Sequence, residues 1–178
     1  MPWRETPAEL ERARCERPEV VATVLGDLFG TLTPPAAETP AAGLAVILLT
    51  RPRSHRNRMW VEGARRVALR GFHAFRFDYH GCGDSGGESA YLDPNQPYRE
   101  DVVAAIRHLR TRHGIRRFAI CGSCFDARTA LSAFLDEGDA IDGLVFMAAP
   151  VMEQSTMTLV RADQRDWRHL GRALRNPE

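Results

Sequence analysis

A cysteine follows an apolar run and precedes a helix-like pattern in the stretch Ile120-Cys121-Gly122-Ser123-Cys124-Phe125-Asp126. The segment Arg117–Cys121 has the composition of a strand, and Phe125–Leu135 repeats apolar side chains at helical spacing. Gly122 lets the chain bend sharply without a side-chain clash. Unpaired amide N–H groups at a helix start stabilise a nearby thiolate. We therefore expect Cys124 to be a nucleophile at the apex of a strand-to-helix turn.

A second chemically informative stretch is the loop Asp78-Tyr79-His80-Gly81-Cys82-Gly83-Asp84-Ser85, followed by two more glycines. So many glycines indicate a tight loop that needs several unusual backbone conformations. The loop directly follows the predicted strand His73–Phe77. It should therefore lie at the carboxyl edge of the sheet, where ligands bind in folds of alternating strands and helices.

Together these two stretches make the sequence resemble the α/β-hydrolase superfamily, whose members pair a D-x-x-G-x-G-x-S loop with a G-x-S-x-G nucleophile elbow. The resemblance runs from about Val20 to Met152. A G-C-G-D-S loop joined to a cysteine elbow is similar to bacterial esterase-like or thioesterase-like hydrolases found beside specialised biosynthetic or export systems. The resemblance implies structural roles for Gly122, Asp78, Gly81, Gly83, Asp84 and Ser85.

The resemblance also implies an oxyanion hole and a catalytic acid and base. The hole would use the backbone N–H of Phe125 and that of Arg53, because Pro52 has no N–H to donate. Glu153 occupies the place where some members have the acid, after the sixth strand, but the favoured interpretation is a solvated loop carboxylate. His80 and His55 each follow a strand, so either could serve as the base or simply brace its loop.

The elbow departs from the family pattern at its fifth position, where Asp126 replaces glycine. A side chain there should crowd the helix against its neighbouring strand. Its negative charge should oppose thiolate formation at Cys124 unless Arg128 pairs with it. The family also places a catalytic histidine after its last strand. The only histidine after the elbow here is His169, and its helix-like surroundings indicate a surface side chain instead.

Every one of the 24 basic residues is arginine, so lysine chemistry such as a Schiff base is excluded. Four of these arginines lie in the stretch R-P-R-S-H-R-N-R after the third predicted strand. With Ser123 they are the candidate substrate-binding residues, namely Arg51, Arg53, Arg56 and Arg58. They could hold the phosphate or carboxylate of acyl-CoA or of a carrier-protein arm. The ordinary alternative is a solvated arginine-rich loop.

The order of elements predicts an α/β fold with a mostly parallel sheet of about six strands flanked by helices, a core that lacks the usual last strands. We expect one truncated domain over residues 1–178, with the core at about 20–152 and a helical segment at 155–175. The predicted strands are Val20–Leu25, Leu28–Leu32, Leu44–Thr50, His73–Phe77, Arg117–Cys121 and Leu144–Ala148. The predicted helices are Trp60–Arg70, Tyr98–Arg112 and Phe125–Leu135, with Gly71, Gly114 and Gly138 as C-caps.

Composition narrows the range of partners. A net charge of +1 gives no pull toward nucleic acid or membrane, and no apolar run approaches the roughly 20 residues of a spanning helix. The charged start lacks a signal peptide's apolar core, so we expect a cytoplasmic protein with four free thiols. Cys121 and Cys124 form the only C-x-x-C, and we expect neither a metal nor a cofactor.

Two functional hypotheses remain open. The first is an acyl-transfer enzyme, a thioesterase, esterase or acyltransferase, acting on a small-molecule acyl substrate. The second is a non-catalytic binding or scaffold protein, or one half of a split hydrolase completed by a partner chain. A protein partner, or a second copy in a homodimer, would dock on the open sheet edge at the sixth strand.

Overall fold

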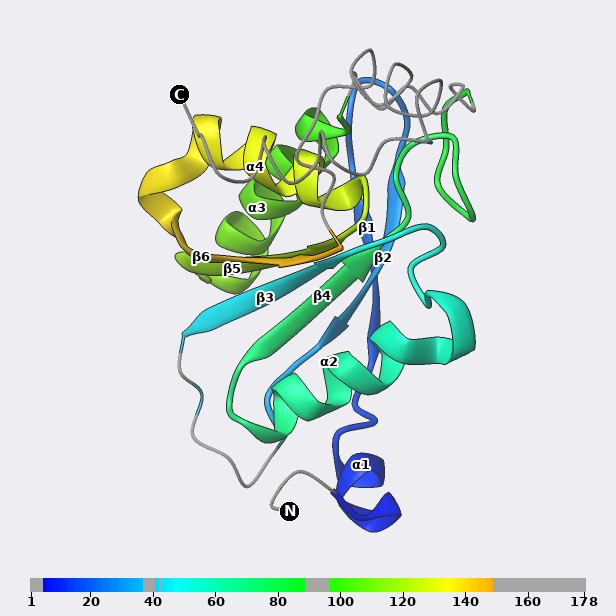
Figure 1. The fold of residues 1–178 in the computed structure, drawn as a ribbon, viewed down its shortest axis with the longest axis vertical. Helices are drawn as coiled ribbons and strands as arrows, with labels where there is room; N and C mark the ends of the chain where they lie inside the picture. The colour runs from blue at the N-terminus through cyan, green and yellow to red at the C-terminus, as the bar shows by residue number, and fades with distance from the viewer. Residues whose placement is uncertain (1–4, 37–40, 42, 89–96, 149–178) are drawn as a thin grey trace, which may run out of the picture.

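Six strands form a single sheet in the order β1-β2-β4-β3-β5-β6 (Figure 1). The structure is a computed structural model that describes residues 5–36, 41, 43–88 and 97–148. The strands are β1 (Arg17–Val21), β2 (Leu28–Thr33), β3 (Leu44–Leu49), β4 (His73–Phe77), β5 (Arg117–Ser123) and β6 (Ile141–Met147). The helices are α1 (Pro7–Arg12), η1 (Arg56–Arg58), α2 (Met59–Leu69), α3 (Arg99–His113), α4 (Asp126–Glu137) and η2 (Gly138–Ala140).

The sheet is mostly parallel. β1 and β2 form an antiparallel hairpin, and β2 also pairs antiparallel with β4. The pairs β3–β4, β3–β5 and β5–β6 are all parallel. Crossover helices connect the successive strands, with α2 between β3 and β4, α3 between β4 and β5, and α4 between β5 and β6. The predicted α/β fold class is therefore confirmed.

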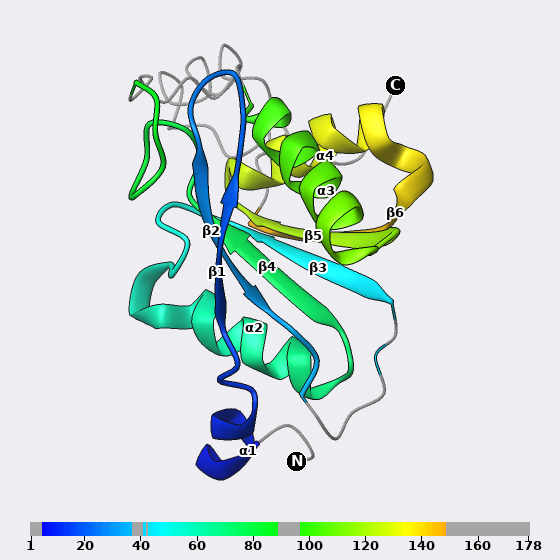
Figure 2. The ribbon, with the colours of Figure 1, turned by 180° about the vertical axis from the view of Figure 1, so that it is seen from behind.

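Helices cover both faces of the sheet, with α2 on one face and α3 and α4 on the other (Figures 1 and 2). Side chains of β3 alternate between the two resulting cores. Ile47 and Leu49 are buried in the cluster that α3 and α4 close, whereas Leu48 packs with Trp60 and Ala64 of α2. This period-two alternation within an almost continuous apolar run is what a strand covered on both sides requires.

Most predicted boundaries lie within two residues of the observed ones, but the first strand is displaced. Val20–Leu25 was expected, whereas β1 ends at Val21. Val24 and Leu25 have strand composition, yet they lie in the hairpin connection and are 102% and 50% exposed. Apolar β-branched residues at a hairpin tip have the same composition as a strand. Composition alone does not show that they are exposed, so the sequence extended the strand too far.

The helix ends show two further differences. Helix α1 was not predicted, although Thr6 and Glu9 form a capping box that the sequence contains. Gly114 ends α3 in the left-handed conformation, as expected for a C-cap, whereas Gly138 is right-handed and continues into η2. The predicted helical segment at 155–175 lies outside the described residues.

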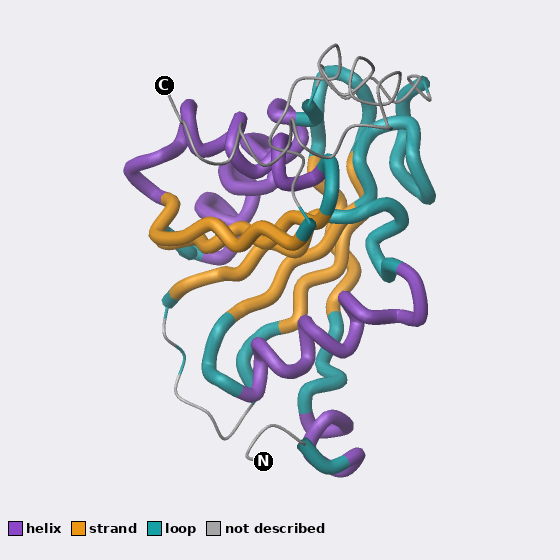
Figure 3. Tube along the Cα trace, in the orientation of Figure 1, coloured by secondary structure: helices purple, strands orange, loops and turns teal. Residues whose placement is uncertain are grey.

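The parallel arrangement decides where function can lie. Because β3, β4 and β5 run in the same direction, the loops that follow them gather at one end of the sheet (Figure 3). These three loops carry nearly all the candidate residues. Within the described part of the chain, no helix has the length and apolar character needed to cross a membrane.

Candidate active site

Cys124 lies between the end of β5 and the start of α4, with its backbone in the left-handed region at φ 54°. A non-glycine residue held there stores about 1–3 kcal/mol of strain. Its N–H donates to the carbonyl of Met147 on β6 at 2.8 Å. The side chain is exposed. The sulfur is therefore presented to solvent at a tight corner that is fixed by a hydrogen bond to the neighbouring strand.

Gly122 makes this corner possible. A Cβ at residue 122 would lie 2.6 Å from the backbone carbonyl of Asp126 and 2.8 Å from the nitrogen of Ala127. Those atoms belong to the first turn of α4 and have little freedom to move. The close approach of helix and strand therefore requires glycine at this position.

A depression of about 320 Å³ lies in front of the cysteine. The loop after β3 contributes one wall and the elbow contributes the other. Its lining residues are Thr50, Arg51, His55, Ser123, Cys124, Phe125 and Asp126. The fold thus brings candidate residues from two loops around one sulfur, and the N–H of Phe125 stands at the helix start, where backbone donors lack an intrahelical acceptor.

Asp126, the residue that replaces glycine in the family motif, turns into the protein. Its carboxylate accepts a hydrogen bond from the Tyr79 hydroxyl at 3.1 Å. Burial raises the pKa of Asp126 above its ordinary value, and the nearby charge of Arg51 partly opposes that rise. The pKa of the fully buried Tyr79 is raised by burial first and by Asp126 second. The partner of Asp126 is therefore Tyr79, which the sequence analysis did not single out.

Arg51 is held between the aromatic rings and the depression. Its guanidinium carbon lies 5.8 Å from the centre of the Tyr79 ring and 5.3 Å from that of Tyr98. Both rings are buried, and they stack on each other with centroids 4.5 Å apart. Cation–π contacts of this kind fix a guanidinium without neutralising its charge. Arg51 and Cys124 therefore line the same depression, and the charge of Arg51 is held by the two rings.

Arg53 is engaged elsewhere. Its backbone N–H donates to Asp78 Oδ1 at 2.7 Å, and its guanidinium bonds to the carboxylates of Asp78 and Asp84. Asp78 is 1% exposed. An oxyanion at the Arg53 amide would have to displace this buried carboxylate. In the described structure, Arg53 ties the loop after β3 to the loop after β4.

The glycine-rich loop is held by hydrogen bonds rather than open to a ligand. Ser85 Oγ donates to the carbonyl of Asp78 at 2.6 Å and accepts from the N–H of Phe29 at 2.8 Å. Gly81 donates to the carbonyl of Gly86 at 2.8 Å. A Cβ at Gly83 would lie 2.4 Å from the Asp78 carboxylate. These contacts fasten the loop to the β1–β2 hairpin and to Asp78.

The two candidate histidines separate in space. His55 lines the depression, and its ring also meets Trp60 edge-on at 5.8 Å. His80 instead binds Asp101 of α3, through its ring Nδ1 at 2.9 Å and its backbone N–H at 2.8 Å. Asp101 is 1% exposed, and burial raises its pKa while the bonds to His80 lower it. Sequence spacing gave no signal for this pair.

The remaining candidates are spread around this centre. Arg58 is exposed at the start of α2. Arg56 lies in η1, but its side chain is outside the described residues, as is the whole of Glu153. All four cysteines are free. Burial raises the pKa of the Cys121 and Cys82 thiols, whereas Cys15 and Cys124 are exposed.

A family model described as serine aminopeptidase, S33, matches residues 42–175, which is more than half of the chain. The chain belongs to this S33 α/β-hydrolase family. Cys124 stands at the strand-to-helix corner of this S33 member, whereas the family is described as a serine aminopeptidase family. A comparison with curated protein sequences finds no match.

Solved structures with the same fold include an α/β serine hydrolase without a lid from Xanthomonas campestris, 18% identical with a TM-score of 0.64. A proline iminopeptidase from Mycobacterium smegmatis is 18% identical with a TM-score of 0.61. An esterase from Pyrococcus furiosus is also 18% identical, with a TM-score of 0.64. The alignments cover 76%, 84% and 98% of this S33-family chain but only 62%, 49% and 64% of the respective structures. The chain thus spans about half to two thirds of their length.

Proposed function

We propose that this S33-family chain catalyses acyl transfer, as a thioesterase, esterase or acyltransferase, with Cys124 as the nucleophile. One observation carries the proposal. The Cys124 side chain is exposed at a strained strand-to-helix corner and lines a depression of about 320 Å³. A cysteine kept for packing alone would not need this backbone conformation. Cysteine also depends less on a base than serine does, because a few per cent is thiolate near neutral pH.

The proposed reaction has two halves. In the first, the Cys124 sulfur attacks the carbonyl carbon of an acyl ester or thioester, and the C=O electron pair becomes an oxyanion. The N–H of Phe125, a residue that lines the depression, would donate to that oxygen. Collapse breaks the bond to the leaving group, which takes up the proton lost by the thiol. In the second, water or another acceptor attacks the acyl-cysteine, releases the acyl product and restores the thiol.

His55 is the better placed of the two histidines to carry that proton. It lines the same depression as Cys124, whereas His80 is bound to the buried carboxylate of Asp101. Asp126 is separated from this role, because its carboxylate is turned to Tyr79. Glu153 stays a candidate acid from the sequence and lies outside the described residues.

Arg51 points to an acyl substrate that carries an anionic group. Arg51 lines the depression, and two aromatic rings hold its guanidinium. In such a position it can pair with a carboxylate or phosphate. Acyl-CoA and acyl groups on a carrier-protein arm both offer phosphate. Free thiols at all four cysteines are also consistent with action in the reducing cytoplasm, which we propose as its location.

Turnover assays test this proposal. Purified protein should hydrolyse or transfer the acyl group of p-nitrophenyl acetate or acetyl-CoA, and Cys124→Ala should reduce the rate to that of buffer. Cys15→Ser is the matched control, because Cys15 is also exposed but lies far from the elbow in sequence, between α1 and β1. His55→Gln should slow the reaction by about 10²–10⁴-fold. Equal rates in Cys124→Ala and wild type would reject the proposal.

A second candidate is favoured by the outer part of the sheet. β6 is the last strand in the described order, and its Val145 and Phe146 are 52% and 45% exposed. A partner chain that completes a split hydrolase, a second copy, or a scaffold partner could cover such residues. In that case purified protein would be inert toward both substrates. Analytical ultracentrifugation would then show self-association, or activity would appear only with the partner.

A further inference from the structure

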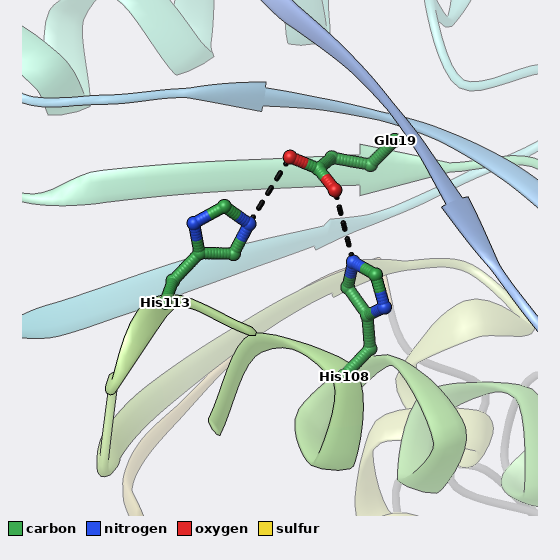
Figure 4. A group of neighbouring side chains, drawn as sticks. All are labelled: Glu19, His108 and His113. Atoms are coloured by element: carbon green, nitrogen blue, oxygen red, sulfur yellow. Dashed lines mark hydrogen bonds and ion pairs between the residues drawn. The ribbon is translucent and has the colours of Figure 1, made fainter. Parts of the chain in front are cut away.

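Outside the elbow, Glu19, His108 and His113 form a cluster that neither the sequence analysis nor the proposed reaction uses. Glu19 lies on β1, whereas His108 and His113 lie on α3 (Figure 4). The carboxylate accepts from His108 Nε2 on one oxygen and from His113 Nε2 on the other, both at 3.0 Å. These contacts join residues 89 and 94 positions apart, which is why no motif in the sequence shows them.

The cluster is largely shielded from water. The side chain of Glu19 is 7% exposed, and those of His108 and His113 are 16% and 18% exposed. Glu19 points to the α3 face of the sheet because it lies two residues before Val21, which is buried in the core that α3 closes. A carboxylate in such a position must be compensated by positive charge or hydrogen-bond donors.

The three donor atoms also fit a metal ion. One ligand atom from each side chain lies within 4.8 Å of the other two. A tetrahedral Zn²⁺ with bonds of about 2.0–2.1 Å holds its ligands about 3.3 Å apart. The two N···O contacts of 3.0 Å lie just below this distance, and the limit of 4.8 Å on the spacing of all three donor atoms lies above it, so small side-chain shifts would bring the donors to the spacing that zinc needs. Two imidazoles and one carboxylate are donors that zinc and its neighbours in the transition series accept.

We propose that Glu19, His108 and His113 form a binding site for one divalent transition metal ion of the zinc class. The ion takes the place of the two N–H···O hydrogen bonds, and each ring proton then resides on Nδ1, which points away from Glu19 (Figure 4). Three protein ligands leave the fourth position for water. The ion links the edge strand β1 to α3, so its effect is on stability.

Arg112 is the cation that competes with the metal. Its Nε lies 3.3 Å from Glu19 Oε2, and its side chain is 67% exposed. An exposed arginine can swing into solvent at little cost. Removing it should therefore leave the metal site intact and relieve repulsion of a divalent cation.

Zinc titration of the purified full chain tests the proposal, with a chromogenic chelator as competitor. A Cys15→Ser/Cys124→Ser background removes the two exposed thiols, which could bind zinc by themselves. The expected result is one Zn²⁺ per chain and a higher melting temperature with zinc present. Loss of a residue that only hydrogen-bonds a metal ligand weakens metal binding by about 10–100-fold. His108→Gln and His113→Gln each remove a ligand itself and should weaken zinc binding by more than that.

Two further measurements keep the test decisive. Arg112→Gln should bind zinc at least as tightly as the background protein, and it tests the site even if a histidine variant fails to fold by circular dichroism. Co²⁺ should bind without a sulfur-to-metal charge-transfer band. No binding in the background protein, undiminished binding in a folded His108→Gln, weaker binding in Arg112→Gln, or a sulfur band would each overturn the proposal.

Discussion

At the scale of single residues, two side chains of the elbow have opposite surroundings. Cys124 faces outward into a depression, and Asp126 faces inward to the Tyr79 hydroxyl. Arg128, which the sequence offered as the residue that could neutralise Asp126, is not what orients the carboxylate in the described structure. Instead a buried phenol binds it, and the charge of Arg51 lies close by. The substituted motif position has thereby become part of the packing beneath the site.

The buried carboxyl makes stability depend on pH in a defined direction. Burial raises the pKa of folded Asp126 above the ordinary 3.8. The carboxyl group therefore loses its proton at a lower pH in the unfolded chain than in the folded one. As pH rises from the unfolded pKa through the folded pKa, the contribution of Asp126 to stability falls. We expect the unfolding free energy of Asp126→Asn, relative to wild type, to increase between about pH 4 and about pH 7.5.

Urea unfolding at the two pH values measures this difference. Asp84→Asn is the control, because its side chain is 67% exposed and sits on the neighbouring loop. A relative stability of Asp126→Asn that stays flat or decreases with pH would contradict the buried position of the carboxyl group.

Gly122 provides a second test at this scale. The Cβ of Gly122→Ala would lie 2.6 Å from the backbone of Asp126, so the variant should lose about 1–3 kcal/mol of unfolding free energy. Because the helix must move away from the strand, the rate at which iodoacetamide labels Cys124 should also change. Gly143→Ala on β6 is the matched control, since a Cβ there meets nothing within 4 Å. Denaturant unfolding of both variants, with iodoacetamide labelling of Cys124, gives the comparison. Equal stability of the two would show that helix and strand are not in close contact at residue 122.

At the scale of elements, hydrogen bonds join the loop after β4 to the loop after β3, to α3 and, through Tyr79 and Asp126, to the elbow after β5. Arg53 of the loop after β3 binds Asp78 at the end of β4, and His80 of the loop after β4 binds Asp101 of α3. The sequence placed each loop correctly because strand composition and glycine content are local signals. It could not assign these partners, since pairing across 21 or 25 residues depends on how the loops pack.

The two carboxylates that bind Arg53 should contribute differently to the free energy of unfolding. Asp78 is 1% exposed and Asp84 is 67% exposed. Asp78→Ala leaves a partly buried guanidinium and amide without their acceptor and should cost about 3–5 kcal/mol. Asp84→Ala should cost less than about 1 kcal/mol, because water screens that pair. Denaturant unfolding of the two variants checks this order, and similar losses would show that Asp78 does not anchor the loop.

At the scale of the whole molecule, the fold was predictable and the site only partly so. Alternating apolar runs and helical spacing indicated a mostly parallel sheet, and the parallel pairing of β3, β4, β5 and β6 confirms it. Cys124, Phe125, His55 and Arg51 meet around one depression, because parallel strands bring their following loops to one edge. The roles of Tyr79, which binds Asp126, and of Asp101, which binds His80, were missed. A hydrogen bond between buried polar side chains leaves no periodic pattern in the sequence.

The central claim is that Cys124 accepts an acyl group. Intact-mass measurement after incubation with acetyl-CoA tests it most directly, because a trapped acyl-enzyme is seen even when turnover is slow. We predict a mass gain of one acetyl group that peptide mapping assigns to Cys124, and no gain at this site in Cys124→Ala. Unmodified protein, or acylation spread equally over Cys15 and Cys124, would contradict the account.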